Sequence, residues 1–297
     1  MTVLRNNFAA LMAPGLRTVF FSRYNEKAPQ YELLFNINKS NRAFEVNQGV
    51  TGFGLVPEKP EGRGIQFDDP IQGYNNTYQH LTYALGYRLS EESYEDDQYS
   101  ILGPKMSKQL GKSCSVTREI QGAGIFNNGF GDVGPDGVSL FNSAHPLEGG
   151  GTTGNRPIIP TALSQTALQT ALTSFRRSVD GRGMLIQLQP KYLVVPPELE
   201  FYARELIGSQ LKPDSINNNI NAVQGSLDIV VMDYLTSANT WFLASDKQDH
   251  SLQWFDRRAI SFKDSTDWDT GDAKYKVDWR SSNGYDDFRG VFGSPGS

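Results

Sequence analysis

The feature that most constrains this chain is a long extended segment, residues 31–76, with too few large apolar residues to bury both faces within one molecule. Apolar and polar residues alternate up to the Pro- and Gly-rich turn PEKPEGRG at 57–64, and alternate again at Ile65 and Phe67. This pattern predicts a long β-hairpin with a polar tip, over about 42–69. A two-stranded hairpin is only marginally stable alone, so we expect this one to lie on another surface.

Residues 1–30 form a second segment whose apolar side chains have little local core to join. Pro14 and Gly15 interrupt the apolar pattern between Asn7 and Phe21, so we expect no continuous helix there. We expect an arm that either packs on a neighbouring molecule or folds back on its own chain. The candidate subunit contacts of the arm and the hairpin are Phe8, Leu11, Phe20, Phe44, Val50, Phe53, Lys59, Arg63 and Phe67.

The next segment predicts one strand followed by an unusually long helix. From Leu81 to Leu89 every second residue is Leu or Tyr, which predicts a half-buried strand over 77–89. Ser90 is a candidate N-cap for a helix with an acidic first turn, and a helical apolar stripe continues to about Phe126. We expect Pro104 either to kink this helix or to begin its longer half.

Beyond Asn127 the sequence is typical of a compact α/β unit, which begins with a loop at 129–154 rich in Gly, Asp and Ser. A helix capped by Thr161 or Ser164 and a second helix that begins at Pro197 both have apolar residues at helical spacing. The sequence NNNIN predicts a further loop at 217–221. Short strands are expected at 192–195, 227–232, 241–244, 252–255 and 275–279.

Charge and composition exclude several classes of protein. The formal net charge is −5, and Lys and Arg form no basic tail or cluster along the sequence, so we expect no tight sequence-independent DNA binding. Cys114 is the only cysteine, which excludes intrachain disulfides and cysteine-based zinc sites. The chain has no apolar signal core and no apolar run of membrane-spanning length, so we expect neither export nor membrane insertion.

The candidate catalytic and metal-binding residues form no recognisable motif. His145 is the histidine best placed for catalysis, because it lies in a loop, but no nucleophile elbow or complete triad accompanies it. The three histidines lack metal-ligand spacing, and the segment 132–137 lacks the oxygen ligands of a calcium loop. We therefore expect a structural role for His145, no cofactor and no enzymatic activity. The alternative is a hydrolase that uses His145 with an acid such as Asp136.

Three stretches after residue 135 carry a family resemblance. They are DGVSLFNSAHPLEGGGTTGN at 136–155, PKYLVVPPELEFYAREL at 190–206 and RSSNGYDDFRGVFGSPG at 280–296. In this order they resemble the major capsid proteins of tailed bacteriophages with the Hong Kong 97 fold, and look most similar to the branch of Mu-like head subunits. The resemblance covers roughly residues 80–297, and the earlier residues match in layout only.

The resemblance implies an α+β fold of the Hong Kong 97 type, made of the parts outlined above. Residues 1–30 would be the N-terminal arm, and 31–76 the extended β-hairpin loop that overlaps an adjacent subunit. Residues 77–149 would form a peripheral domain with the long helix as its spine. Residues 150–270 would form an α/β axial domain, and 271–297 would be C-terminal strands that return to the peripheral domain.

The implied function is that of a major capsid protein, which self-assembles as pentamers and hexamers into an icosahedral shell around double-stranded DNA. The resemblance also implies a separate scaffolding protein, a portal and a place for a decoration protein. The DNA would be enclosed without sequence-specific binding, and no membrane partner is expected. Synthesis and assembly would take place in the cytoplasm of a bacterial host, with the virion capsid as the product. The alternatives are an encapsulin-like nanocompartment shell and a tail tube or sheath subunit.

Overall fold

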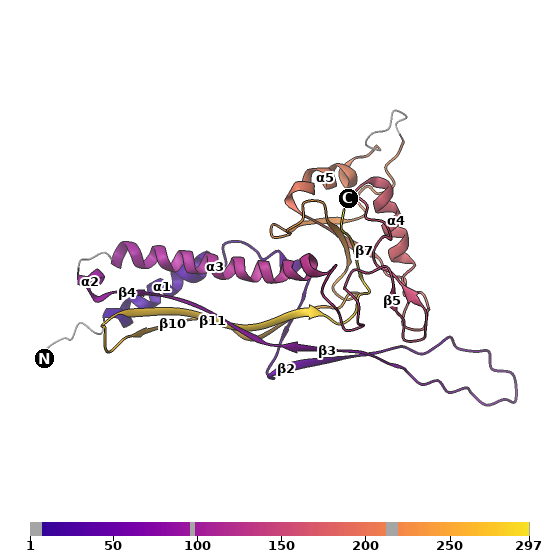
Figure 1. Ribbon diagram of the computed structural model, residues 1–297, viewed down its shortest axis with the longest axis horizontal. Helices are drawn as coiled ribbons and strands as arrows, with labels where there is room; N and C mark the ends of the chain where they lie inside the picture. The colour runs from indigo at the N-terminus through magenta and orange to yellow at the C-terminus, as the bar shows by residue number, and fades with distance from the viewer. Residues whose placement is uncertain (1–7, 96–98, 212–218, 297) are drawn as a thin grey trace.

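The computed structural model describes residues 8–95, 99–211 and 219–296, with the backbone alone at 8–14, 94–95 and 99–100. Figure 1 shows an elongated molecule with a long sheet and two helices along it, a compact unit at one end, and a loop that projects beyond that end. We call the long sheet with its helices the elongated unit, the smaller sheet with its helices the compact unit, and residues 51–71 the extended loop.

The elongated unit is built on a four-stranded sheet in the order β1-β10-β11-β4. Its strands are β1 (Asn36–Lys39), β4 (Leu81–Leu89), β10 (Leu252–Thr266) and β11 (Ala273–Tyr285). β10 and β11 form a long antiparallel hairpin, with β1 parallel to β10 at one edge and β4 antiparallel to β11 at the other. The apolar face packs against helices, whereas Lys263, Lys274 and Lys276 are exposed on the opposite face. Helices therefore cover one side of the sheet, and the other side is covered only near the base of β3 (Gln72–Gln79), where Phe255 packs against Tyr78.

Two helices, α1 (Phe8–Tyr24) and α3 (Tyr99–Asn128), lie side by side on the covered face. α3 confirms the predicted long helix, and Pro104 lies inside it rather than at its start. A short helix, α2 (Glu91–Glu95), begins directly after Ser90, as the capping pattern predicts.

The prediction that Pro14 and Gly15 interrupt the first helix is wrong, because both lie inside α1. A proline within a helix removes one intrahelical hydrogen bond. Leu16 and Phe20 are buried in the core shared with α3 and the sheet, and this burial offsets the lost bond. Residues 1–30 are therefore in part a helix folded back on its own chain, which is one of the two expected arrangements.

The single strand predicted over 77–89 is two strands. β4 carries the alternating Leu and Tyr residues, but β3 (Gln72–Gln79) ends before His80 and belongs to a different sheet. The buried His80 ring occupies the break, with Nδ1 2.9 Å from Ser282 Oγ and Nε2 3.0 Å from Ser40 Oγ. A side chain that bonds on both sides in this way redirects the chain from one sheet to the other.

The compact unit confirms the expected combination of short strands and helices. Its sheet has the order β12-β9-β7-β8, with β7 (Pro190–Val195), β8 (Asp228–Val231), β9 (Trp241–Ser245) and β12 (Val291–Ser294). The helices are α4 (Gln165–Arg176) and α5 (Glu200–Gly208), the latter preceded by a 3-10 turn at Pro197–Leu199. The Ser164 hydroxyl caps α4 by accepting the Ala167 backbone N–H at 3.2 Å. A two-stranded ribbon, β5 (His145–Pro146) and β6 (Thr152–Thr153), lies in the loop before α4.

An aromatic core joins the two units. Phe126 near the end of α3, Phe141 in the following loop and Phe242 in β9 pack with ring centroids between 5.0 and 6.4 Å apart. Trp254 of β10 stacks on Tyr31, in the 3-10 turn Tyr31–Leu33, with centroids 4.4 Å apart. The two units therefore share one continuous buried cluster.

The chain crosses between the two units in places that the expected boundaries do not follow. β10 falls within the expected axial segment 150–270 but lies in the elongated unit, and β12 falls within 271–297 but joins β9 in the compact unit. Only the most apolar parts of the long strands were expected, at 252–255 and 275–279. β10 and β11 have 15 and 13 residues. Many of their outward-facing residues are charged because helices cover only the other face of the sheet, so the apolar pattern in the sequence indicates shorter strands.

Candidate assembly surface

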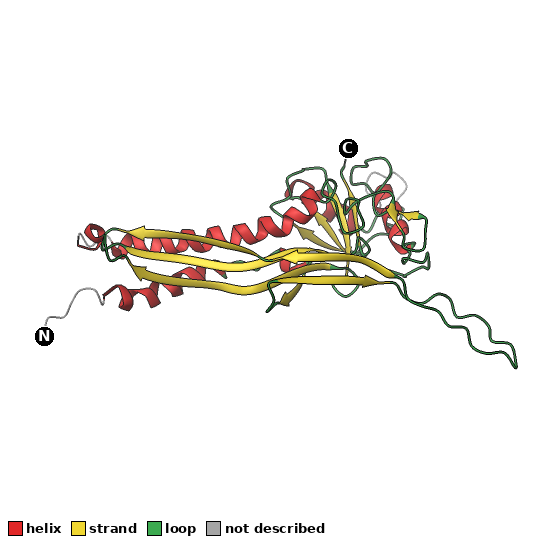
Figure 2. Ribbon diagram, turned by 60° about the horizontal axis from the view of Figure 1, so that its bottom comes forward, coloured by secondary structure: helices red, strands yellow, loops and turns green. Residues whose placement is uncertain are grey.

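The predicted hairpin forms as a β-ladder only at its base. β2 (Phe44–Val50) pairs with β3 as a separate two-stranded sheet. The Thr51 backbone N–H donates to the Ile71 carbonyl, and the Ile71 N–H donates to Thr51 Oγ1, each at 2.9 Å, which closes the neck of the extended loop. The prediction that the chain returns as a strand at Ile65 and Phe67 is wrong. The returning strand is β3, which begins only at Gln72. Figure 2 shows the extended loop projecting as two arms without strand structure.

The extended loop presents large apolar side chains to solvent on both arms. The exposed fractions are 63% for Phe53, 85% for Leu55, 95% for Val56, 64% for Ile65 and 90% for Phe67. A single exposed apolar side chain is common in any protein, but a group of them on one projecting segment marks a contact surface. The loop is therefore the strongest candidate for a contact with another molecule.

Asp68 anchors the extended loop to the compact unit. Its carboxylate accepts the Gly54 backbone N–H at 2.7 Å and a hydrogen bond from Arg182 Nη1 at 2.5 Å. Arg182 follows α4 in the chain and also donates to the Asp69 carbonyl. The Gly54 N–H, and then Arg182, hold the pKa of the Asp68 carboxyl below its usual value. One carboxylate thus ties the two arms of the loop to each other and to the body of the protein.

The base of the hairpin is held by the C-terminal segment. Asp286 accepts hydrogen bonds from the Tyr78 hydroxyl at 2.6 Å and from the Asn47 amide at 2.8 Å. The Asn76 amide donates to the Tyr285 carbonyl at 2.6 Å. Burial raises the pKa of the Asp286 carboxyl, and the hydrogen bonds to it act in the opposite direction. The direction in which the hairpin leaves the sheet is therefore set within one molecule.

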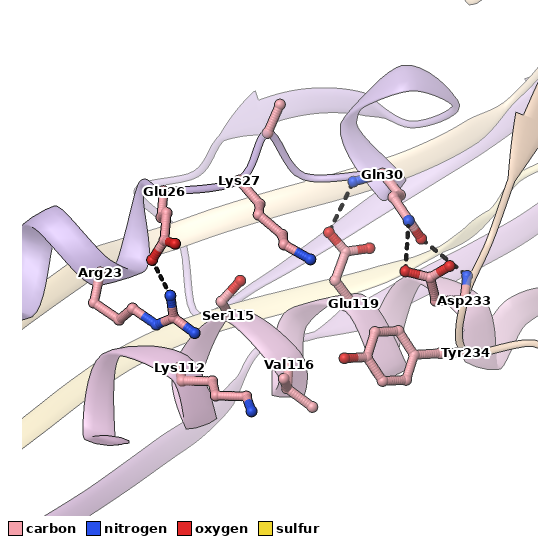
Figure 3. Close-up of a pocket in the computed structure, with 11 residues that line it drawn as sticks. Arg23, Glu26, Lys27, Gln30, Lys112, Ser115, Val116, Glu119, Asp233 and Tyr234 are labelled. Atoms are coloured by element: carbon pink, nitrogen blue, oxygen red, sulfur yellow. Dashed lines mark hydrogen bonds and ion pairs between the residues drawn. The ribbon is translucent and has the colours of Figure 1, made fainter. Parts of the chain in front are cut away.

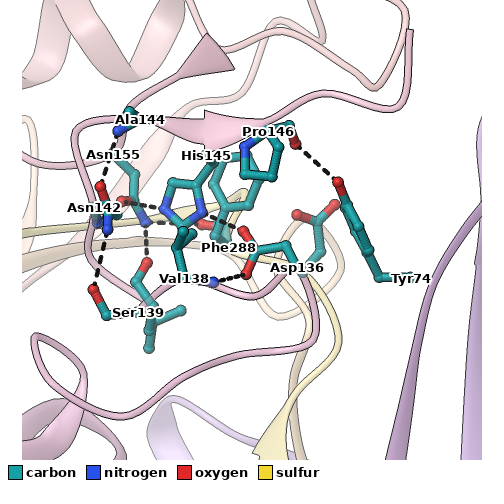
Figure 4. A network of polar contacts seen from close by, with 12 residues as sticks. Tyr74, Asp136, Val138, Ser139, Asn142, Ala144, His145, Pro146, Asn155 and Phe288 are labelled. Atoms are coloured by element: carbon teal, nitrogen blue, oxygen red, sulfur yellow. Dashed lines mark hydrogen bonds and ion pairs between the residues drawn. The ribbon is translucent and has the colours of Figure 1, made fainter. Parts of the chain in front are cut away.

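The loop at 136–155 is organised around His145, whose side chain is fully buried. Its Nδ1 lies 2.5 Å from Asp136 Oδ2 and its Nε2 lies 3.0 Å from Asn155 Oδ1, as Figure 4 shows. The ring also stacks on Phe288, with centroids 3.6 Å apart. One buried histidine thus joins both ends of this loop to the C-terminal segment.

The same loop supports the hairpin. Pro146, directly after His145, accepts a hydrogen bond from the Tyr74 hydroxyl of β3 at 3.2 Å (Figure 4). The first and third of the stretches that carry the family resemblance therefore meet at the base of the extended loop. His145 and Asp136 have side chains that are 0% and 7% exposed, so neither is accessible to a substrate. This burial favours the structural role of His145 over the hydrolase alternative.

The predicted contact residues have three different outcomes. The exposed ones lie on the hairpin and the extended loop; they are Phe44, Val50, Phe53, Lys59, Arg63 and Phe67. Phe20 is wrong as a subunit contact, because it is fully buried in its own chain and packs on Phe262 with ring centroids 5.4 Å apart. The side chains of Phe8 and Leu11 lie outside the described residues.

Sequence reasoning missed several exposed apolar side chains elsewhere. Trp268, in the turn between β10 and β11, is 94% exposed, and Ile158, Phe201 and Ile220 are exposed in or near the compact unit. A signal was available for Trp268, because a tryptophan between two aspartates in a turn is poorly suited to a core. The other three give no signal in the sequence, because their exposure depends on which helix and loop faces the fold covers.

A polar groove runs between α1 and α3. Its walls carry Arg23, Lys108 and Lys112, and Figure 3 shows the end of the groove near Glu119. Glu119 accepts the Gln30 backbone N–H at 2.8 Å, and burial raises the pKa of its carboxyl. The fold thus brings together cations that are far apart in the sequence, and the acidic residues Glu26, Glu119 and Asp233 line the same groove.

Other functional sites have little support in the described part of the chain. No group of three or more His, Cys, Asp or Glu residues among the described residues could hold a metal ion. No described helix is both long and apolar enough to cross a bilayer. Cys114 is a buried thiol, and burial raises its pKa to about 12, which disfavours the reactive thiolate.

Comparison with known proteins gives one family and many similar folds. A family model described as phage capsid protein matches residues 74–292. The capsid of bacteriophage JBD30 is similar with a TM-score of 0.59 and 14% identity, over 71% of this chain and 92% of that chain. The capsid of cyanophage P-SCSP1u has a TM-score of 0.59 and 10% identity, over 90% of this chain and 88% of that chain.

A virus-like particle from Pyrococcus furiosus is also similar, with a TM-score of 0.52 and 10% identity, over 94% of this chain and 97% of that chain. No curated protein matches the chain. At these low identities the structural likenesses bear on the fold alone, and they confirm the expected mixture of helices and sheets.

Proposed function

Because the chain belongs to the phage capsid protein family, we propose that it is the major subunit of a phage head and assembles with copies of itself into a closed icosahedral shell. In this role it supplies contact surfaces rather than a reaction site. The observation that carries the proposal is the extended loop, which is anchored at its base and exposed along its length. The matched family favours this role over a nanocompartment shell and over a tail subunit.

The extended loop would supply the main contact between neighbouring copies. Because Asp68, Arg182 and Asp286 set its direction before assembly, less conformational entropy is lost when it binds. The loop projects beyond the body of the molecule (Figure 2). Its large apolar side chains are exposed, so another molecule must bury them. A contact in which the loop of one copy meets a different surface of the next can close into rings, and rings of five and six copies build an icosahedral shell.

The remaining parts and partners follow from the same proposal. The elongated unit would be the peripheral domain, and the compact unit would be the axial domain, near the centre of each ring. The shell would enclose double-stranded DNA without reading its sequence, which the net charge of −5 supports. A separate scaffolding protein, a portal and a decoration protein would be its partners, and assembly would take place in the cytoplasm of the bacterial host.

Electron microscopy of the purified chain, expressed with and without a co-expressed scaffolding protein, tests this function. We expect closed particles in at least one condition. Deletion of residues 57–64 should abolish particles without unfolding the protein, because this tip lies beyond the anchored base. A Glu61→Gln variant, which keeps the length of the tip, is the control. Wild-type protein that forms no closed particles in either condition, or normal particles from the deletion variant, would contradict the proposal.

A further inference from the structure

The turn between β10 and β11, residues 267–272, presents an aromatic side chain that its own chain does not cover. Trp268 is 94% exposed, whereas the other tryptophans are at most 3% exposed. Those buried tryptophans are Trp241, Trp254 and Trp279. An indole in water at the tip of a long hairpin does not contribute to the core of this molecule. It is, however, among the side chains that contribute most to binding when a partner buries them.

The backbone of this turn is held in one conformation. The Asp267 N–H donates to the Asp272 carbonyl at 2.9 Å, and the Gly271 N–H donates to the Asp267 carbonyl at 3.0 Å. Gly271 has a φ of +71°, a conformation that side-chain-bearing residues rarely adopt, and it packs closely against Glu91. The Asp267 carboxylate is paired with Lys274. Trp268 is therefore presented on a preorganised support, which reduces the entropy lost on binding.

The surroundings of Trp268 determine the chemistry of a partner. Asp269 follows Trp268 directly and Asp272 lies at the end of the turn, and neither makes an ion pair with any other described residue. Glu91 and Glu92, at the start of α2, are exposed close to the same turn. A partner surface should therefore combine positive charge with aliphatic or planar groups that an indole can contact.

The groove between α1 and α3 has that chemistry. α1 contains no acidic residue, and the first acidic residue of α3 is Glu119, near the end of the groove. Lys108 and Lys112 line the groove, are exposed, and make no ion pair among the residues the structure describes. Arg23 and Glu26 both line the opposite wall and are paired with each other, which leaves the charges of the two lysines unpaired. The groove is open to solvent, so a side chain from outside can reach its walls.

We propose that the Trp268 turn of one subunit docks in the α1–α3 groove of a second copy of this chain. The indole lies against the aliphatic stems of Lys108 and Lys112, while Asp269 and Asp272 face their ammonium groups. The two surfaces differ and lie on different parts of the molecule, so the contact is heterologous and can repeat around a ring. The proposal rests on the shell function and adds a contact that does not involve the extended loop. Duplex DNA could also occupy this groove, but it would leave the exposed tryptophan beside carboxylates unexplained.

Tryptophan fluorescence tests the burial directly, because only one indole is accessible in the free subunit. Acrylamide should quench about a quarter of the emission of unassembled wild-type protein, one accessible tryptophan of four. A Trp268→Phe variant should lose that quenchable part while its thermal unfolding is unchanged, which assigns the signal. In wild-type particles the quenchable part should fall to nearly zero. A quenchable fraction that is the same in particles and in free subunits would overturn the proposal.

Charge reversal tests the partner surface. Lys108→Glu with Lys112→Glu, or Asp269→Lys with Asp272→Lys, should each raise the protein concentration needed for assembly at least about tenfold. Combining all four changes should return the threshold to within about threefold of wild type, because opposite charges face one another again. Thr270→Ser is the matched control, because it changes the same turn but keeps the hydroxyl that accepts the Asp272 backbone N–H.

The outcomes separate this contact from the shell function as a whole. If wild-type protein forms particles but the reversed variants assemble equally well, the docking proposal alone is wrong. If the Lys108 and Lys112 variant forms normal particles that retain less DNA, the groove binds phosphate and the docking proposal is also wrong. If wild-type protein forms no particles at all, the shell function fails first.

Discussion

Replacing Phe67 by serine should weaken assembly strongly and leave the isolated subunit almost unchanged. The side chain is 90% exposed, so its loss removes little packing from the subunit, and its free energy of unfolding should change by less than about 0.5 kcal/mol. If a neighbouring copy buries the ring completely, the contact loses about 2 kcal/mol. Each subunit donates one loop and receives one, so the loss occurs once per subunit and corresponds to a roughly 30-fold higher threshold concentration for assembly.

Light scattering across a concentration series measures this threshold, and particles should be confirmed by electron microscopy. Gln66→Ser, next to Phe67 in the same arm of the loop, is the matched control because it removes a polar side chain that is also exposed. A threshold that differs from wild type by less than threefold would refute the burial of Phe67 by a neighbour. A marked drop in the unfolding temperature of the free subunit would show instead that the ring supports its own chain.

Three further predictions concern the supports of the loop and the body of the protein. Arg182→Ala removes the ion pair with Asp68, so protease cleavage within residues 52–70 should become several-fold faster while thermal unfolding shifts by less than about 2 °C; unchanged cleavage would contradict the anchoring role. His145→Ala should lower the free energy of unfolding in urea by about 3 kcal/mol, because it leaves a buried space and unpartnered polar groups, and a change below about 1 kcal/mol would contradict that. Burial lowers the pKa of His250 from 6.5 to about 4, so the unfolded chain binds the proton more readily; the associated stability is complete above about pH 6.5 and is lost as the pH falls toward 4. Wild type should therefore lose about 2.5 kcal/mol more than His250→Asn between pH 7 and 4.5, and equal losses in urea titrations would exclude this cause.

Elements with strong local periodicity could be predicted from the sequence. Three such elements are the long helix α3, the helix α4 with its Ser164 cap, and the buried strand β7. In each, the spacing of apolar residues or the capping residue can be read from neighbouring positions in the sequence. The exposed apolar character of the extended loop was also predictable, since residues 31–76 lack the partners needed to bury both faces.

Features that depend on tertiary pairing could not be predicted. α1 continues through Pro14 because a neighbouring helix and a sheet bury its apolar face. The residues near Pro14 in the sequence give no sign of this tertiary packing. The loop anchor joins Asp68 to Arg182 across 114 positions, so no spacing rule could identify it. β10 was expected to be short because helices cover only one face of its sheet and the other face carries charged residues.

The polar groove between α1 and α3 shows the same limit for charge. Arg23 lies far from Lys108 and Lys112 in the sequence, and the overall composition is acidic. Packing of α1 beside α3 brings these cations together on one surface. Net charge therefore describes the average surface of this protein but not the surface that a partner meets.

Hydrogen exchange across residues 52–70, measured in free subunits and in assembled particles, tests whether a second copy of the chain covers the extended loop. We expect fast exchange in the free subunit, because this segment lacks strand pairing, and at least about tenfold slower exchange in particles, where a second copy covers it. β9 is buried in the free subunit and should be protected equally in both states. Fast exchange of the extended loop in intact particles would contradict the proposal that a neighbouring copy of the chain binds and covers this loop.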